Sequence, residues 1–328
     1  MDQSKFSMIY NYRSNFTRSI ASDHITIATH MSASNSSASN SARFQRLLDL
    51  NSRWDGYISV AVYTKQNATV TNFIDPFIKS HASSFDGKVS FHLIIDKRSD
   101  KDKKYYPINV MRNIAMEQTE TELVLNLDVD FIPSLHSHDR LKMHISHLKD
   151  KIWSIMVLPA FERKLSGNEN WATITSSNLP ATKKELLKRI GAGDDERFIP
   201  FHSKFFPAGH GPTEYARWYK ASDPYHVGYQ KDYEPYYVVR KSAELPPFWE
   251  HFTGFGKNKL SWVEEMYIAG YELFIVPDAF IIHINHSKKE IHRRLRKEMN
   301  IEYKHRFWPY LTRTYAKVSA KNKAIFKV

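Results

Sequence analysis

The chain of 328 residues contains no cysteine. Disulfide bonds, cysteine-ligated zinc and thiol nucleophiles are therefore excluded, and a reducing compartment fits this composition. No apolar stretch approaches the roughly 18 residues that a membrane span needs. Residues 1–22 are polar with scattered charge and lack the apolar centre of a signal peptide. We therefore expect residues 1–22 to form a flexible N-terminus and the chain as written to be soluble.

Basic residues outnumber acidic ones, and most of the excess lies near the C-terminus. The 47 Lys and Arg against 35 Asp and Glu give a net charge of +12. From Lys288 to the end there are 13 basic and 3 acidic residues, so this end carries 13 − 3 = +10 and the remainder carries 34 − 32 = +2. A basic tail over residues 311–328 could contact anionic lipid, an acidic polysaccharide or RNA. A solvated basic helix with a frayed end explains the same composition.

The segment Glu122–Pro133 is the most informative in the chain, because an apolar run ends there in Asp128 and Asp130. Alternate residues of a strand point to the same face, and open α/β sheets bind ligands at the carboxyl ends of their strands. Two close carboxylates repel each other unless a cation lies between them. A hard divalent ion that carries a diphosphate would satisfy both, as in nucleotide-sugar glycosyltransferases. The alternative is a solvated strand end with two turn-forming aspartates.

Apolar runs alternate with helical patterns, which predicts an α/β domain with a mixed, mostly parallel sheet flanked by helices. The hydrophobic fraction of 42% is sufficient for a single compact domain. The run Ser32–Ser41 is expected to be a low-complexity loop. The expected strands are Ile25–Thr29, Tyr57–Tyr63, Val89–Ile95, Leu123–Leu127, Trp153–Leu158, Tyr236–Arg240, Glu272–Val276 and Ala279–His283. The expected helices are Ala42–Leu50, Pro107–Met116, His136–Leu148, Thr182–Ile190 and Ser261–Ala269.

Further residues could complete a site around the two aspartates. Arg112 and Asn113 lie on the helix just upstream, where an arginine fork suits a phosphate or a sugar carboxylate. His283 ends an apolar strand, and an imidazole beside two carboxylates suits Mn²⁺ as well as Mg²⁺. The segment Gly254–Lys259 is a glycine turn that opens a helix, and it could bring backbone N–H groups close to a ligand. Each of these has an ordinary structural explanation when taken alone.

Transfer of a sugar to a hydroxyl with inversion requires a general base. Carboxylates that could act as this base occur in two places, Asp232 with Glu234 and Glu264 with Glu265. For Glu264 a solvated helix face is the better interpretation.

These residues occur in an order that resembles one family. From about Ile25 to Tyr310 the chain is similar to the family that contains the second catalytic domain of the LARGE glycosyltransferases and the β-1,4-glucuronyltransferase of dystroglycan glycosylation. The shared motifs are Thr29–His30, Tyr106–Asn113, Asp128–Phe131, Leu158–Glu162, Gly209–Thr213 with Trp218, Asp232–Pro235, Gly254–Lys259, Glu265 and Phe280–His283.

The resemblance implies a GT-A fold over residues 23–310, with a donor half at about 23–160 and an acceptor half at about 161–310. It also implies a UDP-sugar donor, Mn²⁺ (or Mg²⁺), and inversion at the anomeric carbon. Metal ligands would be Asp128, Asp130 and His283, with His286 shared only with the LARGE type. Glu265 would be the first choice of base or acceptor contact, before Asp232 and Glu234. Donor-binding residues would be Thr29, His30, Arg112, Asn113, Asp128, Gly254, Gly256 and Lys259.

The expected reaction moves glucuronate from UDP-glucuronate to a glycan hydroxyl such as that of a xyloside. UDP-N-acetylglucosamine or UDP-xylose would require only modest changes to the pocket. Alternatives from other classes are a metal-dependent phosphoesterase or nucleotidyltransferase, and a non-catalytic basic module that binds anionic polysaccharide, lipid or RNA. No specific nucleic acid is expected as a partner.

The chain departs from the family in three respects. Animal members are anchored in the Golgi, whereas this sequence shows no anchor; the Ser32–Ser41 run looks like an insertion; and cysteine is absent. The resemblance thus implies a Golgi or secretory lumen, with a cytoplasmic location as the alternative.

Overall fold

The computed structural model describes residues 5–12, 23–34, 36–99, 105–145, 153–165, 167–191, 197–254, 256–284 and 293–316. His286, which the resemblance marked, and the tail beyond residue 316 lie outside these ranges.

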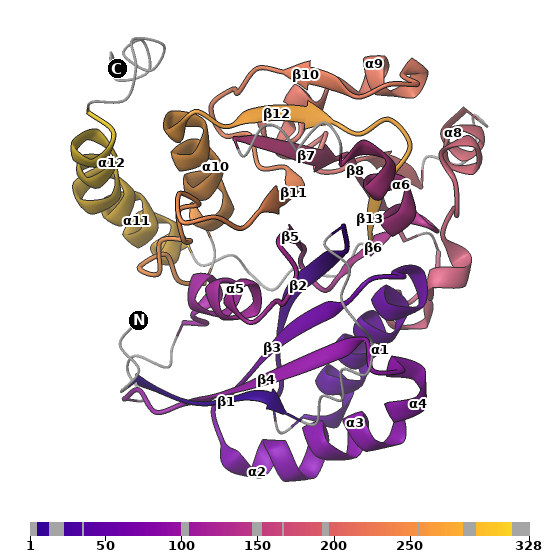
Figure 1. Cartoon of the computed structure of the whole chain (residues 1–328). Helices are drawn as coiled ribbons and strands as arrows, with labels where there is room; N and C mark the ends of the chain where they lie inside the picture. Colours follow the sequence, from indigo (N-terminus) through magenta and orange to yellow (C-terminus); the bar gives the residue numbers. More distant parts are fainter. Residues whose placement is uncertain are drawn as a thin grey trace.

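A mixed sheet forms the centre of the described chain and joins nine strands (Figure 1). Parallel pairing links β4, β3, β2 and β5, and also links β7 to β12, while the other neighbours are antiparallel. In spatial order the strands are β1 (Phe6–Tyr12), β4 (Val89–Asp96), β3 (Ile58–Thr64), β2 (Ile25–Ser32), β5 (Leu123–Asn126), β11 (Tyr236–Arg240), β7 (Ser154–Leu158), β12 (Glu272–Ile275) and β10 (Tyr225–Val227).

A second sheet of four strands begins directly after the Asp128–Asp130 segment. Its order is β6 (Phe131–Pro133), β13 (Ile281–Ile284), β8 (Ala160–Arg163) and β9 (Phe198–Pro200). In the register of this sheet, His283 of β13 is opposite Phe131 of β6 and Glu162 of β8. The pairing therefore brings the end of the chain's last described strand beside the two aspartates.

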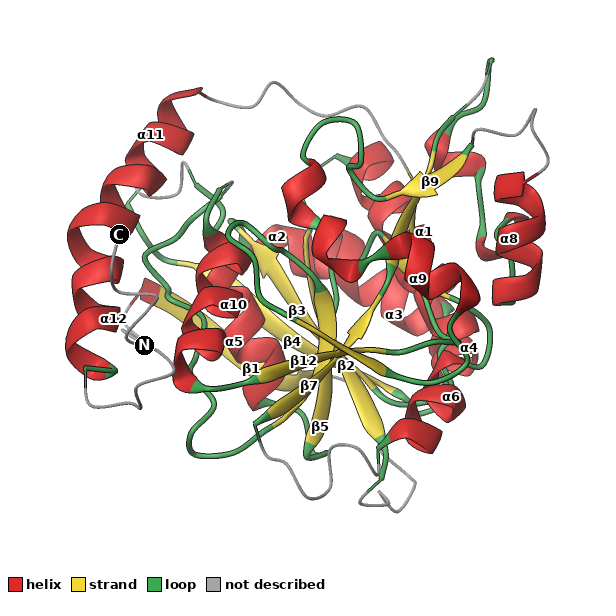
Figure 2. Cartoon of the chain, turned by 90° about the horizontal axis from the view of Figure 1, so that it is seen from above, coloured by secondary structure: helices red, strands yellow, loops and turns green. Residues whose placement is uncertain are grey.

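Helices cover both faces of the large sheet. Figures 1 and 2 show α5 and α10 on one side and α1 on the other, with α11 and α12 stacked outside α10. The α-helices are α1 (Ser37–Arg53), α2 (Asn67–Thr69), α3 (Asp75–Ser80), α4 (Ala82–Phe85), α5 (Ile108–Glu117), α6 (Ser137–His144), α8 (Lys183–Gly191), α9 (Tyr215–Lys220), α10 (Asn258–Ala269), α11 (Arg293–Glu302) and α12 (Trp308–Thr314). Short π-helical or 3-10 segments are η2 (Val70–Ile74), η4 (Trp171–Thr173), η5 (Ser176–Asn178), η6 (Pro207–Gly209), η7 (Gly211–Thr213) and η8 (Tyr303–Phe307). In the described part of the chain, no helix is both long and apolar enough to cross a bilayer.

The burial of β3 explains why the parallel strands appear in the sequence as continuous apolar runs. Every residue from Ile58 to Thr64 is buried, because helices shield both faces of this part of the sheet. A polar side chain of this strand forms its hydrogen bond inside the protein: the hydroxyl of Ser59 donates to the carbonyl of Ala115 in α5 at 2.7 Å. Burial on both faces fixes β3 at the centre of the core.

The C-terminal helices pack through a separate apolar cluster. Its buried members are Phe252, Ile268, Leu295, Met299, Phe307 and Leu311. Hydrogen bonds reinforce it: Trp249 Nε1 donates to Glu302 at 2.9 Å, and the Tyr303 hydroxyl donates to Glu264 at 2.7 Å. Glu264 therefore binds a neighbouring helix and is not the solvated residue that the sequence suggested.

The α/β class with a mixed sheet flanked by helices is confirmed, and two local predictions differ. Residues 6–12, expected to be flexible, form β1, which pairs antiparallel with β4. Helix α1 begins at Ser37, inside the expected serine-rich loop, because its interior side chains pack on the sheet. Antiparallel β11 lies between β5 and β7, which makes the sheet mixed, as expected.

Candidate active site

Asp128 lies at the centre of a set of polar contacts beyond the end of β5. Its Oδ1 accepts from Arg112 Nη2 at 2.9 Å and lies 3.4 Å from His30 Nε2. Its Oδ2 accepts from the Tyr236 hydroxyl at 2.7 Å and from Lys259 Nζ at 3.2 Å. Burial opposes ionisation of Asp128, but Lys259 and Arg112, together with His30, outweigh it and hold the pKa of this carboxyl well below its usual range. Asp128 is therefore a fixed carboxylate.

Arg112 is buried beneath Asp128 and faces the protein interior. Its Nη1 donates to Asn109 Oδ1 at 3.1 Å and to Asn258 Oδ1 at 3.0 Å, while Nη2 holds Asp128. The ring of Phe248 lies 5.3 Å from the guanidinium carbon. Since the side chain is only 1% exposed, Arg112 positions Asp128, and it has little surface to offer a phosphate.

The side chain of Asn113 also hydrogen-bonds to groups of the protein. Its amide nitrogen donates to the carbonyl of Phe248 at 2.9 Å and to Glu250 at 3.0 Å, and its oxygen accepts from the Phe248 N–H at 2.8 Å. These bonds fix the segment that leads into the glycine turn. The structure thus gives the expected donor-binding residue Asn113 a clear scaffold role.

Thr29 and His30 lie next to each other in the second half of β2, and His30 is the one that contacts Asp128. His30 Nδ1 shares a hydrogen bond of 3.0 Å with the Tyr106 hydroxyl. Burial lowers the pKa of His30, so this imidazole is neutral at pH 7. The Thr29 hydroxyl is buried and has no hydrogen-bond partner among the described residues. His30 therefore lies beside Asp128.

Asp130 and His283 form the second half of the site. His283 Nε2 lies 3.3 Å from Asp130 Oδ2. The rings of Phe131 and Phe201 lie 5.0 and 5.1 Å from the imidazole and fix its orientation. The His283 side chain is buried, while Asp130 is 29% exposed and so remains open on one side.

These residues fit a divalent ion. Ligand atoms that share one octahedral ion at about 2.1 Å lie roughly 3 Å apart, close to the 3.3 Å between Asp130 Oδ2 and His283 Nε2. A carboxylate oxygen with an imidazole nitrogen suits Mn²⁺. Both oxygens of Asp128 already have cationic or hydroxyl partners. The geometry therefore favours Asp130 and His283 as the metal pair over Asp128.

Two lysines at the start of α10 connect Asp128 and the Asp232–Pro235 motif. Lys259 Nζ lies 3.2 Å from Asp128 Oδ2 and 3.3 Å from Glu234 Oε1, and it also donates to the Tyr236 hydroxyl. Lys257 Nζ lies 3.3 Å from Asp232 Oδ1. Both candidate bases of the Asp232–Pro235 motif are thus held at the start of α10, and Glu234 is joined to Asp128 through one lysine.

The glycine turn serves packing as much as ligand access. Gly254 has a φ of +64°, and a Cβ there would lie 2.7 Å from Leu295 of α11. Its N–H donates to the carbonyl of Tyr106 at 2.8 Å. The turn requires glycine because α11 approaches so closely, and the Gly254 N–H is not available for a ligand. Gly256 has a φ of +103°, which also favours glycine.

Glu265 lies apart from the aspartates. It is seven residues from Asn258 on α10, roughly 10 Å along the helix axis, and its Oε1 accepts from the Tyr315 hydroxyl at 3.2 Å. No contact among the described residues joins it to Asp128, Asp130 or His283. Burial raises the pKa of Glu265 to about 7, against hydrogen bonds from Tyr310 and Tyr315. The environment is that of a buried packing contact with α12.

We expect the Glu265→Gln substitution to stabilise the protein at alkaline pH. The folded-state pKa of about 7 exceeds the ordinary 4.5, so the folded state binds more protons between these values. Stability contributed by the neutral acid is then lost as pH rises through this window. Glutamine mimics the neutral acid, and should raise the free energy of unfolding at pH 8 by about 1–3 kcal/mol.

Urea unfolding of both proteins at pH 5 and pH 8 measures this effect. The control is Glu298→Gln on α11, which removes a partly exposed carboxylate paired with Arg294. If the free energy of unfolding changed with pH by the same amount in wild type and in Glu265→Gln, the raised pKa of Glu265 would be contradicted.

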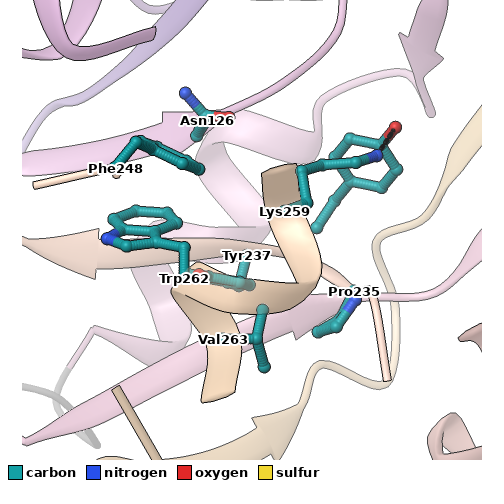
Figure 3. A pocket seen from close by; sticks show the side chains of 8 residues that line it. Asn126, Pro235, Tyr237, Phe248, Lys259, Trp262 and Val263 are labelled. Atoms are coloured by element: carbon teal, nitrogen blue, oxygen red, sulfur yellow. Dashed lines mark hydrogen bonds between the residues drawn. The ribbon is translucent and has the colours of Figure 1, made fainter. Parts of the chain in front are cut away.

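A small pocket lies behind Lys259, between α10 and the strands β5 and β11 (Figure 3). Aromatic rings form much of its wall: Trp262 stacks on Tyr237 at 5.4 Å and lies 3.8 Å from Phe248. This packing holds the first turn of α10 against the sheet, which explains why Lys259 reaches Asp128. The lining residues are Asn126, Pro235, Tyr236, Tyr237, Phe248, Lys259, Trp262 and Val263.

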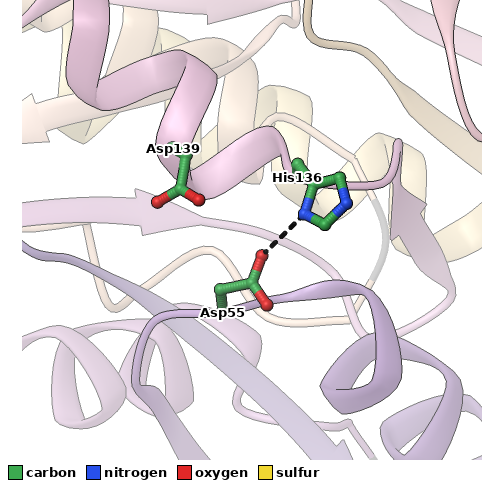
Figure 4. A group of neighbouring side chains, drawn as sticks. All are labelled: Asp55, His136 and Asp139. Carbon is green, nitrogen blue, oxygen red and sulfur yellow. Dashed lines mark ion pairs between the residues drawn. The ribbon is translucent and has the colours of Figure 1, made fainter.

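A different group of potential metal ligands lies elsewhere (Figure 4). Ligand atoms of Asp55, His136 and Asp139 lie within 4.8 Å of one another, and His136 Nδ1 is 3.5 Å from Asp55 Oδ2. Asp55 precedes β3, whereas Asp128 follows β5, so this group occupies the opposite edge of the parallel strands. All three side chains are more than half exposed, as ordinary surface groups are.

Sequence reasoning missed several residues of the site. Tyr236, Tyr106, Asn109 and Asn258 supply hydrogen bonds to Asp128, His30 or Arg112. Tyr106 and Asn258 lie inside motifs that were recognised, and Tyr236 directly follows one, so motif membership was a usable signal. Asn109 also lies inside the motif Tyr106–Asn113, although its role depends on the burial of Arg112.

A mixed α/β sheet with paired aspartates and a histidine at the strand ends is the arrangement of the GT-A type glycosyltransferase fold. The chain belongs to the glycosyltransferase family described as glycosyl-transferase for dystroglycan, whose model matches residues 97–316.

Curated relatives agree with this membership. The chain is 34% identical over 246 residues to xylosyl- and glucuronyltransferase LARGE2s of Gallus gallus, covering 75% of this chain and 31% of that protein. It is 30% identical over 249 residues to LARGE1 of Homo sapiens, covering 75% of this chain and 30% of that protein. The chain thus spans about a third of the length of these relatives.

The fold is also similar to that of a solved glycosyltransferase, GalNAc-T7 with UDP, GalNAc and Mn²⁺. The TM-score is 0.53 at 13% sequence identity, over 92% of this chain and 53% of the other.

Proposed function

We propose that this chain catalyses inverting, metal-dependent transfer of glucuronate from UDP-glucuronate to a glycan hydroxyl such as that of a xyloside. The observation that carries the proposal is a pair of contact sets in a member of this family: Lys259 joins Asp128 to Glu234, and Asp130 lies beside His283. UDP-xylose is the second donor to test, because the relatives are named xylosyl- and glucuronyltransferases. As the resemblance implies, the acceptor would be a glycoprotein glycan in the secretory lumen.

Asp130 and His283 would hold Mn²⁺ or Mg²⁺. When bound, the ion supplies Lewis-acid stabilisation of charge on the diphosphate. Asp128, fixed by Arg112 and His30, would orient the donor from the opposite side of the site. Lys259 is 11% exposed and would add positive charge near the departing UDP. Arg112 would act through Asp128 as a positioning residue.

Glu234 is the base that we propose, with Asp232 as the alternative. Glu234 is 26% exposed and shares Lys259 with Asp128, whereas Glu265 is buried against α12. Glu234 would take the proton of the acceptor hydroxyl, whose oxygen then bonds to the anomeric carbon. The bond from that carbon to the diphosphate oxygen breaks, and UDP leaves with the electron pair.

UDP release from purified protein tests the reaction. Release should occur with UDP-glucuronate and Mn²⁺, rise when a xyloside is added, and stop with EDTA. Glu234→Gln should lower kcat by roughly 10²–10⁴-fold, with little change in the KM for the donor. The matched Glu265→Gln variant should keep its activity.

Two results would count against the proposal. Full activity in Glu234→Gln with loss in Glu265→Gln would make Glu265 the base. Absence of release from every UDP-sugar, in protein shown to be folded, would reject the enzyme and favour a binding module.

A further inference from the structure

Phe205 is the most exposed large apolar side chain in the described part of the molecule. It is 83% exposed, whereas the other exposed large side chains reach at most 66%, at Met143. It lies on the segment between β9 and η6, residues 201–206. An exposed phenylalanine beside a polar site is informative only if its position is fixed and its neighbours have a defined role.

The segment that carries Phe205 is a closed turn. The carbonyl of His202 accepts from the N–H of Phe205 at 3.1 Å and from that of Phe206 at 2.8 Å. His202 has a φ of +55°, and its ring stacks on Phe201 at 3.9 Å. The Phe206 ring packs so closely on Gly209 that a Cβ there would lie 2.5 Å from it. The turn therefore presents Phe205 from a fixed backbone.

Both ends of this turn are tied to the candidate active site. Phe201 is buried, and its ring lies 5.1 Å from the ring of His283 and 4.9 Å from that of Phe131. At the other end, the carbonyl of Gly209 accepts from the N–H of Glu234 at 2.8 Å. Phe205 thus lies on a turn that contacts the histidine of the metal pair through Phe201 and the backbone of the carboxylate that we assign as base through Gly209.

We propose that Phe205 is the platform on which a pyranose ring of the acceptor glycan stacks. The C–H face of a pyranose packs on an aromatic ring, while its hydroxyls keep their contact with water. The contacts that tie this turn to the site would place the hydroxyl of a stacked sugar within reach of Glu234 and the metal pair. The proposal rests on the proposed function, since it names the acceptor subsite of the same reaction.

The surroundings of Phe205 favour one sugar ring over a protein partner. Its neighbours along the chain, Ser203, Lys204, Pro207 and Ala208, are exposed small or polar residues, and the other exposed large apolar side chains of the described residues lie on other segments of the chain. A stable protein interface buries about 800 Å² on each partner, far more than one phenylalanine face provides. A single aromatic ring beside a polar site matches the size of one pyranose.

The experiment measures UDP release at varied concentrations of methyl β-xyloside, an acceptor without an aromatic aglycone. Phe205→Ala should raise the KM for the xyloside about five- to tenfold, as expected when a stacking aromatic is truncated. The kcat and the donor KM should stay within about twofold of wild type. Phe205→Trp should restore a low KM, because the stacking face is retained. The control is Met143→Ala on α6, which removes a similarly exposed apolar side chain and should change nothing.

A xyloside KM that is unchanged in Phe205→Ala, or a donor KM that rises equally, would overturn the assignment. If wild-type protein transfers no sugar, the proposed function fails, and saturation-transfer NMR of xyloside binding then tests Phe205 separately. Loss of the pyranose signal in Phe205→Ala would support the platform, and an equal signal in both proteins would reject it.

Discussion

The Asp130→Asn variant is expected to lose metal-dependent turnover, by at least roughly 10²–10³-fold, while keeping its fold. The substitution removes the negative charge that faces His283 Nε2 at 3.3 Å. Hard divalent ions bind ionised carboxylates far better than amides. Because Asp130 is 29% exposed, no uncompensated buried charge is created, and the thermal unfolding midpoint should change little. The measurement is UDP release as a function of Mn²⁺ concentration, with circular dichroism as the check on folding.

The exposed group of Asp55, His136 and Asp139 provides the matched control for this prediction. Asp55→Asn removes a carboxylate from the only group of three or more potential ligands that satisfies a 4.8 Å separation in the described chain. Activity and Mn²⁺ dependence should be unchanged, since this group lies at the other edge of the strands. Normal activity in Asp130→Asn together with loss in Asp55→Asn would move the metal site to the surface group.

Replacement of Arg112 by leucine should be the most destabilising change in the site. Removal of the guanidinium leaves Asp128 without its shortest ionic contact and leaves the side-chain oxygens of Asn109 and Asn258 without their donor. Removing one partner of a buried pair costs about 3–5 kcal/mol. We expect the free energy of unfolding to fall by about 3 kcal/mol or more, and activity to be lost with the position of Asp128.

Urea unfolding monitored by tryptophan fluorescence measures this loss. Arg112→Lys keeps the charge but lacks the fork that reaches both asparagines and Asp128, so it should recover only part of the stability. The control Arg217→Leu removes an exposed partner of Glu214, and should cost less than about 1 kcal/mol. Equal stability of Arg112→Leu and Arg217→Leu would show that the buried contacts contribute nothing.

The strands that carry the site could be predicted because their patterns are local. The run before Asp128 has the composition of a buried strand, and the two aspartates follow it in the structure as expected. β1 was missed because its burial is partial and depends on pairing with β4, whose partner residues are 79 to 90 positions away. The position of β11 between β5 and β7 also depends on distant pairing, which no local pattern encodes.

The roles of individual site residues were less predictable. Glu265 belongs to a shared motif, yet the structure places it against Tyr315. Asn113, expected at the donor, instead binds the backbone of Phe248. In both cases the residue type suggested a catalytic or ligand-binding role. The packing of α5, α10 and α12 determined which group the side chain contacts.

The sequence by itself determined the α/β class, the Asp128–Asp130 strand end and the order of motifs that marks the family, because alternation and spacing are properties of neighbouring residues. Only the tertiary structure decided which group neutralises which carboxylate. Asp128 meets Arg112, Tyr236 and Lys259 across 16, 108 and 131 positions, and Asp130 meets His283 across 153. Such contacts form only when the whole core folds, since burial and charge pairing depend on the arrangement of all the packed elements.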